Sequence, residues 1–425
     1  MNIPNPESAQ YVLLICSVGG APEPIVESLL YWKPAAVRFI VSPQTRQQVD
    51  VVFRSYAERA GQPLSPGCHE CVAVGDPQNF REVVAALRPL ASTVDGWTRR
   101  GNGYGVVVDF TAGTKCMSAA LAVASHRWPC RLSYVGGDRR SKEGVGVVES
   151  GAERVVHCAN PWDAFGYQAV EEAVTVFNHG GYAAAAALLE QALRCATDPS
   201  VKRELSTLLA LTEAYAAWDR FDHKTAEGKF ANALKNRNDL LAMFTNPEEL
   251  ILNLQRDQKR VTELAGQPEP ARVWVEDLLR NAERRAAESR HDDAVARLYR
   301  AFEALAQLRL REQHGIADTK SVALEKLPDE RRQQWKDLAR DGKVSIGLQE
   351  AYAVLLDFGD ELGQKFDKEG LNGTQSPLVA RNQSILAHGF QSVGEPAYSK
   401  LHDSLCSLGP FSAADPRPWH LPVPR

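Results

Sequence analysis

The chain has 425 residues, which is enough for two or three domains rather than one. Its hydrophobic fraction of 44% and charged fraction of 24% are those of an ordinary globular protein. The formal net charge of −4 provides no global basic field, which disfavours a non-specific nucleic-acid coat protein. Any contact with RNA therefore depends on a local site.

The N-terminal segment does not resemble a signal peptide, because it has no basic region leading into an apolar run. No stretch approaches the roughly 20 apolar residues that span a bilayer. Cys68 and Cys71 form a lone CxxC without a second pair at zinc spacing, so a structural role is favoured over a redox or metal role. The other cysteines are scattered, as is typical of reduced core residues. We expect a cytoplasmic protein without a membrane partner.

Residues 1–160 alternate between strand and helix patterns. Continuous apolar runs are followed by helical stretches that begin near residues 24, 45 and 117; the runs occupy residues 11–16, 36–41, 106–110 and 131–135. Apolar strands without alternation, separated by helices, indicate a parallel sheet covered on both faces. The sequence therefore predicts an α/β Rossmann-like N-terminal domain.

The composition changes after residue 160. Residues 161–268 contain much Ala, Leu and Glu at helical spacing and predict a helical linker domain. Residues 269–408 continue as an all-α domain, with a break at 370–376 before a helix that carries Arg381. Residues 409–425 form a proline-rich tail that we expect to be extended or partly disordered.

A turn of small residues follows the third apolar run. It contains Thr111, Gly113, Thr114 and Lys115, which offer hydroxyls, a cation and the N-terminus of the next helix to an anion. The spacing fits neither GxxxxGK[ST] nor GxGxxG, which disfavours ATP hydrolysis and NAD binding. Residues 17–20 follow the first run, and therefore lie along the same sheet edge. The pattern fits either a nucleotide or polyphosphate site or simply two tight strand-to-helix turns.

Arg381 and His388 are seven residues apart. If the segment is helical, both project from one face, about 10 Å apart along the axis. Cleaving RNA without a metal requires groups that move protons and a cation for the phosphorane charge. Histidine and arginine supply these functions. Spacing alone favours an ordinary surface pair on an amphipathic helix over a catalytic pair.

Other Arg and His pairs match the same loose pattern, in which the arginine precedes the histidine by five to seven residues; they are Arg284 and Arg285 with His291, and Arg309 with His314. The pair at 381 and 388 differs in its setting. Asn382 follows the arginine directly, no charge lies between arginine and histidine, and a glycine follows the histidine at once. This setting favours the pair at 381 and 388.

Together these features resemble the CRISPR-associated CARF–HEPN proteins that accompany type III interference systems. The resemblance rests on residues 109–115, on 17–20, on the helical run 296–303, and on Arg381-Asn382 followed by His388-Gly389. The resemblance implies a HEPN-like C-terminal half and a homodimer. It also implies an N-terminal domain that binds a cyclic oligoadenylate of four or six adenylates as activator, with no cofactor or metal.

Carried over to this chain, the resemblance assigns residues to two sites. The activator would be held by Thr111, Gly113, Thr114 and Lys115, with Ser17, Gly19 and Gly20 lining the pocket. Arg381 and His388 of two subunits would form a metal-independent endoribonuclease site for single-stranded RNA, which leaves a 2′,3′-cyclic phosphate. Asn382 would position the phosphate or the histidine.

Three alternatives stay open. Some N-terminal domains of this family also degrade their activator, and Thr111 and Lys115 are placed to orient a 2′-hydroxyl for such a reaction. A sensor coupled to a metal-dependent DNase is disfavoured, because the helical half offers no strand bearing Asp, Glu and Lys. A sensor without nuclease activity, in which the helices act as an adaptor or regulator, predicts that the activator leaves RNA intact.

Overall fold

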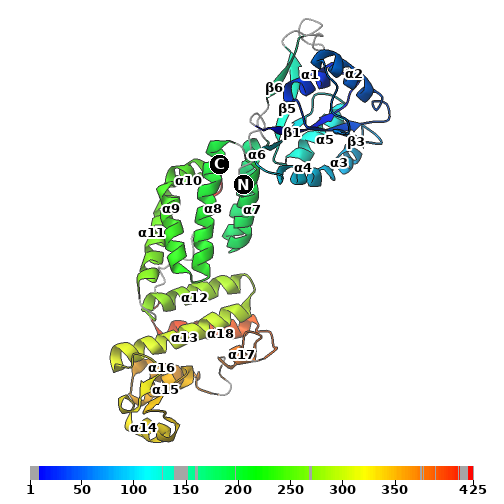
Figure 1. Cartoon of the computed structure of the whole chain (residues 1–425). Helices are drawn as coiled ribbons and strands as arrows, with labels where there is room; N and C mark the ends of the chain where they lie inside the picture. Colours follow the sequence, from blue (N-terminus) through cyan, green and yellow to red (C-terminus); the bar gives the residue numbers. More distant parts are fainter. Residues whose placement is uncertain are drawn as a thin grey trace.

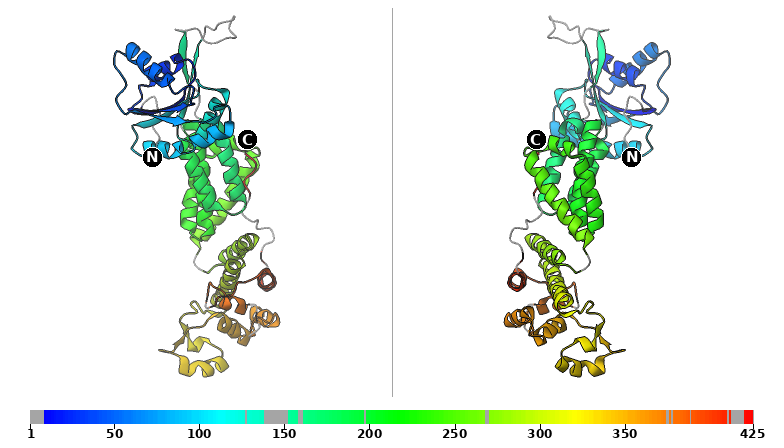
Figure 2. Two further views of the ribbon diagram at one scale, coloured as in Figure 1. Left: turned by 90° about the vertical axis from the view of Figure 1, so that its right-hand side faces the viewer. Right: turned by 90° about the vertical axis from the view of Figure 1, so that its left-hand side faces the viewer.

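The structure is a computed structural model, and it describes residues 9–126, 128–137, 152–157, 161–196, 198–267, 270–373, 376, 378–387, 389–409, 411 and 420–424. Figure 1 shows three parts that follow one another along an elongated molecule: a sheet with its helices, a helical bundle, and a second helical part. Figure 2 shows the same arrangement from two further directions. Within the described residues, the structure contains no helix with the length and apolar composition of a membrane span.

The N-terminal part is built on a six-stranded sheet with the order β3-β2-β1-β4-β5-β6. Strands β1 to β5 are parallel, and β6 is antiparallel to β5. The strands are β1 (Tyr11–Ser17), β2 (Ala36–Val41), β3 (His69–Ala73), β4 (Tyr104–Asp109), β5 (Arg131–Gly137) and β6 (Glu153–His157). The predicted Rossmann-like α/β domain is confirmed, although the sheet is mixed rather than wholly parallel.

Helices cover both faces of this sheet. The side chains of β1 alternate between two cores, with Leu14 in one and Leu13 in the other. The first core includes residues of α1 (Glu23–Trp32) and α2 (Gln48–Ala60). The second includes residues of three helices, α3 (Phe80–Leu87), α4 (Leu90–Thr98) and α5 (Lys115–Ser125). Burial on both faces explains why the central strands are continuous apolar runs.

The two strands of this sheet that the sequence pattern did not indicate are β3 and β6, at its opposite edges. Strand β3 has the sequence HECVA, and none of its residues is fully buried. Strand β6 has the sequence ERVVH. An edge strand has one neighbour and less cover, so it does not require an apolar run. Cys71 lies within β3, opposite Phe39 of β2.

The middle part is a bundle around one hydrophobic core. Its helices are α6 (Pro161–Asn178), α7 (Tyr182–Cys195), α8 (Pro199–Asp219), α9 (His223–Lys235), α10 (Arg237–Met243) and α11 (Pro247–Gly266). The end of the chain returns to this bundle, where Leu421 is buried. The Asn178 side chain accepts a hydrogen bond from the main-chain nitrogen of Leu421 at 2.8 Å and donates one to its carbonyl at 2.9 Å. The described end of the predicted tail is therefore packed.

The C-terminal part has its own core, which includes Leu298, Phe302, Tyr352 and Phe366. Its helices are α12 (Arg272–Ala287), α13 (His291–His314), α14 (Asp329–Trp335), α15 (Leu348–Asp357), α16 (Glu361–Lys368), α17 (Leu378–Gln383) and α18 (Glu395–Leu408), with short 3-10 turns η1 (Leu324–Lys326) and η2 (Lys336–Leu338). The expectation of an all-helical domain is wrong in one detail. The strands β7 (Val322–Ala323) and β8 (Lys343–Val344) pair antiparallel to form a short two-stranded ribbon. Each strand has only two residues, and segments this short carry no periodicity that a sequence pattern would show.

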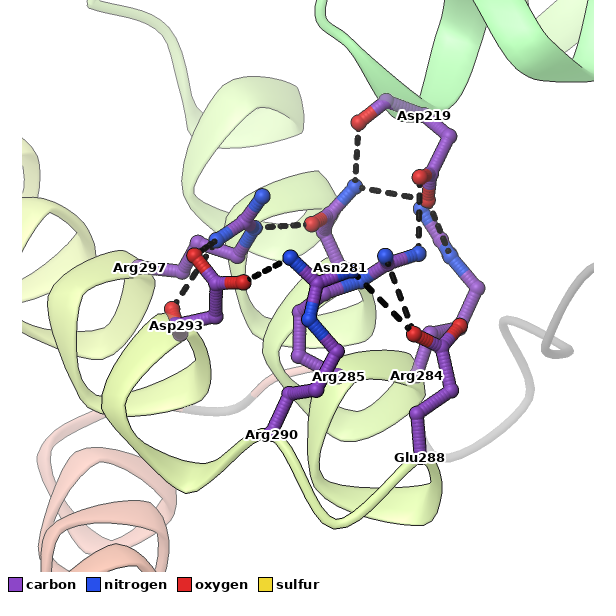
Figure 3. Close-up of polar contacts among 8 residues, drawn as sticks. All are labelled: Asp219, Asn281, Arg284, Arg285, Glu288, Arg290, Asp293 and Arg297. Carbon is purple, nitrogen blue, oxygen red and sulfur yellow. Dashed lines mark hydrogen bonds and ion pairs between the residues drawn. The ribbon is translucent and has the colours of Figure 1, made fainter. Parts of the chain in front are cut away.

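A buried polar network joins the last residue of α8 to α12 (Figure 3). The Asp219 carboxylate accepts hydrogen bonds from Asn281 at 3.1 Å, from Arg284 at 3.1 Å and from Arg285 at 2.7 Å. On the other side of Asn281, its side-chain oxygen accepts a hydrogen bond from Arg297 of α13. The middle and C-terminal parts are therefore connected by paired charges as well as by the chain.

Candidate functional site

The structure brings the two predicted glycine-containing loops together at one edge of the sheet. Strands β1 and β4 are parallel neighbours, so the loops that follow them leave from the same edge. The Ser17 hydroxyl donates a hydrogen bond to the carbonyl of Ala112. A methyl group at Gly19 would meet the main-chain nitrogen of Gly113 at 2.8 Å. The order of the strands reverses between β1 and β4, and such a switch point is where open α/β sheets bind ligands.

Asp109, the last residue of β4, organises the turn that follows it. One carboxylate oxygen accepts a hydrogen bond from the main-chain nitrogen of Thr111 at 2.9 Å. The other accepts hydrogen bonds from the hydroxyls of Ser28 and Ser133. Burial raises the pKa of Asp109, and the hydrogen bonds from Ser28, Thr111 and Ser133 oppose that rise. Sequence reasoning gave Asp109 no role of its own, although a carboxylate that ends an apolar strand is a usable signal.

The predicted hydroxyl ligands are engaged with the protein. Thr111 Oγ1 accepts a hydrogen bond from the main-chain nitrogen of Val135 at 2.7 Å. Thr114 is the N-cap of α5, where its hydroxyl accepts from the nitrogen of Met117 at 3.1 Å. These hydroxyls therefore shape the turn. The group that remains exposed beside them is Lys115, whose main-chain nitrogen lies in the first turn of α5, where helix geometry supplies no acceptor.

Arg381 lies in α17, and this helix ends at Gln383. The expectation that one continuous helix carries Arg381 and His388 is therefore wrong. The chain turns back after the helix, with hydrogen bonds from Gly389 nitrogen to the Ser384 carbonyl at 3.2 Å and from Gln391 nitrogen to the Gln383 carbonyl at 3.0 Å. His388 lies outside the described residues.

The glycine after His388 has a steric role. A Cβ atom at Gly389 would collide with the main chain of Gln383, because the returning chain passes directly over the end of α17. The sequence singled out this glycine only as part of a motif. The structure gives it a physical reason, which is the close approach of two backbone segments.

The side chain of Arg381 lies over an aromatic ring. Its guanidinium carbon is 4.8 Å from the centroid of the Tyr299 ring, and one of its nitrogens donates a hydrogen bond to the Asn382 side chain at 3.3 Å. In the part of the chain that the structure describes, no carboxylate forms an ion pair with Arg381. Its positive charge is therefore available to a phosphate.

Among the described residues, the arginines of the other Arg and His pairs, unlike Arg381, form ion pairs with carboxylates. Arg309 and His314 both contact the Asp360 carboxylate, at 2.8 Å and 2.9 Å. Arg284 and Arg285 pair with Asp219 in the network of Figure 3. These charges are neutralised by structural ion pairs, which favours Arg381 over them as a phosphate-binding group.

Three large apolar side chains near Arg381 are exposed. They belong to the turn after α17, where the exposed fractions of the residues reach 65%, 46% and 97% for Ile385, Leu386 and Phe390. Apolar side chains that gather in one exposed segment mark an interaction surface more often than isolated ones do. This surface lies next to the predicted catalytic residues in the sequence.

Comparison with known proteins now places the chain among CRISPR-associated proteins. Residues 264–412 match the model of the Csm6 HEPN domain, and residues 165–262 match the model of the Csm6 6H domain. These two adjacent matches together cover more than half of the chain. The chain therefore belongs to the Csm6 family, and the predicted membership of the CARF–HEPN proteins is confirmed.

Two relatives illustrate the likeness. The chain is 27% identical over 350 residues to the CRISPR system endoribonuclease Csm6 of Thermus thermophilus, which covers 72% of this chain and 71% of that protein. Its fold is similar to that of Enterococcus italicus Csm6 bound to cyclic hexa-2′-fluoro-hexa-dAMP, with a TM-score of 0.54, 10% identity and 96% coverage of each chain. The second likeness shows the fold alone.

Proposed function

We propose that this chain is a CRISPR ribonuclease that responds to a cyclic oligoadenylate. Its similarity to an endoribonuclease and its match to a HEPN domain support the RNA-cleaving activity. The observation that supports placing the nuclease site at Arg381 is its unpaired charge, because no carboxylate among the described residues forms an ion pair with it. Next to it lies Asn382, in the part of the chain that matches the HEPN domain.

The proposed chemistry is metal-independent cleavage of single-stranded RNA. His388 removes the proton of the 2′-hydroxyl, and that oxygen attacks the adjacent phosphorus. The bond to the 5′-oxygen breaks, and a protonated histidine of a second copy gives that oxygen a proton. The products are a 2′,3′-cyclic phosphate and a 5′-hydroxyl. Arg381 stabilises the negative charge that develops on the phosphate oxygens, and Asn382 positions the phosphate or the histidine.

The proposed activator site is the edge of the sheet between β1 and β4. Lys115 and the main-chain nitrogens at the start of α5 face a phosphate, Gly19 and Gly113 let the two loops of the pocket pack closely, and Gly20 leaves open space for the ring beside the backbone. Ser17, Thr111 and Thr114 fix the shape of the two loops through their hydrogen bonds. We propose a ring of four or six adenylates as the ligand.

We also propose a homodimer, because each copy supplies one arginine and one histidine to a site that needs two of each. The exposed Ile385, Leu386 and Phe390 support this assembly. Sedimentation with and without the activator tests it. A chain that stays monomeric under both conditions contradicts the composite site.

Cleavage of a fluorescent single-stranded RNA tests the nuclease. We expect cutting that depends on cyclic oligoadenylate, that persists in EDTA, and that is lost in Arg381→Ala and His388→Ala. Arg194→Ala is the matched control, because Arg194 is a largely exposed surface residue paired with Glu190 in the middle part. Loss of activity in EDTA would overturn metal independence. Equal cutting by His388→Ala would overturn the site.

Activation is tested separately from cutting. Lys115→Ala should raise the activator concentration needed for half-maximal cleavage and leave basal cutting unchanged, whereas the exposed Lys235→Ala should change neither. An unchanged activator dependence in Lys115→Ala would contradict the proposed pocket. Chromatography of the activator after incubation with the protein tests the further proposal that Thr111 and Lys115 orient a 2′-hydroxyl for ring cleavage.

A further inference from the structure

Tyr299 is the side chain against which Arg381 lies. It belongs to α13, and its ring faces the Arg381 guanidinium at 4.8 Å between the guanidinium carbon and the ring centroid. A separation below about 6 Å over the face of an aromatic ring gives a favourable cation–π contact. The contact joins two helices that are far apart in the sequence.

An aromatic partner has a consequence that an acidic partner would not have. A carboxylate would neutralise the guanidinium and occupy its N–H groups. A ring face instead contacts the flat side of the guanidinium and leaves the N–H groups at its edge free to bind phosphate oxygens. The acidic residue one helical turn from Tyr299, Glu303, is itself paired with Arg300 at 3.2 Å. The surroundings therefore orient the Arg381 charge without cancelling it.

The ring is held by a rigid element. The residues that flank Tyr299 on the inner side of α13, Leu298 and Phe302, are 0% exposed. The hydroxyl of Tyr352 donates a hydrogen bond to the Phe302 carbonyl at 3.0 Å. Helix α17, in contrast, has only six residues and is followed by a turn. A helix this short is not stable by itself, so its position depends on contacts with neighbouring elements.

We infer that Tyr299 is a positioning residue that holds the Arg381 guanidinium in the orientation required to bind the scissile phosphate. The inference rests on the proposed function, because it assigns Tyr299 a role through Arg381. Tyr299 does not take part in proton transfer. Its ring restricts the rotamers of Arg381, so that less conformational entropy is lost when the guanidinium binds the charge that develops on the phosphate in the transition state.

The test compares Tyr299→Leu with Tyr299→Phe in the activated RNA-cleavage assay. Leucine keeps an apolar side chain of moderate size and removes the ring, whereas phenylalanine keeps the ring and removes only the hydroxyl. We expect Tyr299→Leu to lower kcat about tenfold with little change in KM, because the contact acts on the group that stabilises the transition state. We expect Tyr299→Phe to stay within about twofold of the wild type.

Each outcome separates the inference from the proposed function. If Arg381→Ala is inactive and Tyr299→Leu cuts as fast as wild type, the positioning role is wrong and the proposed nuclease site stands. If Tyr299→Phe loses as much activity as Tyr299→Leu, the ring face is not the important feature and the inference is overturned. If Arg381→Ala cuts normally, the proposed site itself fails. Thermal unfolding of each variant shows whether Tyr299→Leu is folded. If Tyr299→Leu is unfolded, Tyr299→Trp replaces it in the test, and because tryptophan keeps an aromatic face, this variant should be active.

Discussion

Substitution of Asp219 by alanine is a sensitive probe of the joint between the middle and C-terminal parts. The side chains of Asp219, Arg284 and Arg285 are 14%, 9% and 7% exposed, so their charges are largely withdrawn from water. Removing the carboxylate leaves Arg284 without its acceptor at 3.1 Å. Arg285 loses its acceptor at 2.7 Å but keeps Glu288 at 3.1 Å.

The expected loss is about 3 kcal/mol of unfolding free energy. Breaking a buried ion pair on one side costs about 3–5 kcal/mol, and the remaining contact between Arg285 and Glu288 places this case at the lower end. For a unit of the size that matches the HEPN domain, this loss corresponds to a fall of about 6–12 °C in the thermal midpoint. Asp219→Asn should lose less, because its amide oxygen still accepts a hydrogen bond.

Thermal unfolding followed by circular dichroism measures the effect. Asp329→Ala is the matched control, since Asp329 also pairs with an arginine, Arg332 at 3.3 Å, but its side chain is 92% exposed. Exposed pairs contribute about 0–1 kcal/mol, so the control should change the midpoint little. If Asp219→Ala and Asp329→Ala unfold at the same temperature, the network of Figure 3 does not stabilise the joint as argued.

Two further predictions concern the sensor and α18. Gly19→Ala should raise the activator concentration for half-maximal cleavage, because its methyl group would meet a main-chain nitrogen at 2.8 Å. Gly96→Ala is the control, because the space around Gly96 is open, and it should leave that concentration unchanged. Contacts with Cys406 and Glu283 raise the pKa of His402 from 6.5 to about 10, so its stabilising charge is complete below pH 6.5 and lost as the pH rises towards 10. Wild type should therefore lose thermal stability relative to His402→Gln across that window. If the thermal midpoints of wild type and His402→Gln change in parallel with pH, the charge of His402 does not stabilise the fold.

The architecture of the N-terminal part was largely readable in the sequence. Residues 11–16, 36–41, 106–110 and 131–135 were predicted as strands, and they correspond to β1, β2, β4 and β5. Helices cover both faces of the sheet, so the side chains of these strands are buried in two cores. Burial on both faces requires a continuous apolar run, and such a run is visible in the sequence. The edge strands β3 and β6 were not predicted, because their pairing depends on a neighbouring strand and not on their own composition.

The nuclease site was readable only as a set of residue types. The sequence determined that Arg381 precedes Asn382, that no charge separates it from His388, and that a glycine follows. It suggested a continuous helix, because helical spacing placed both residues on one face. At the end of α17, the Gln383 carbonyl accepts a hydrogen bond from the Gln391 main-chain nitrogen, and no local periodicity encodes this contact with the returning chain.

Tertiary structure alone decided which arginine carries a free charge. By spacing alone, Arg284, Arg309 and Arg381 were comparable matches, since each stands five to seven residues before a histidine. Folding brings Asp219 and Asp360 to the first two and the Tyr299 ring to the third. The physical reason is that spacing along a helix fixes where a side chain stands on its own element. Its charge environment is set by residues that arrive from elsewhere in the chain.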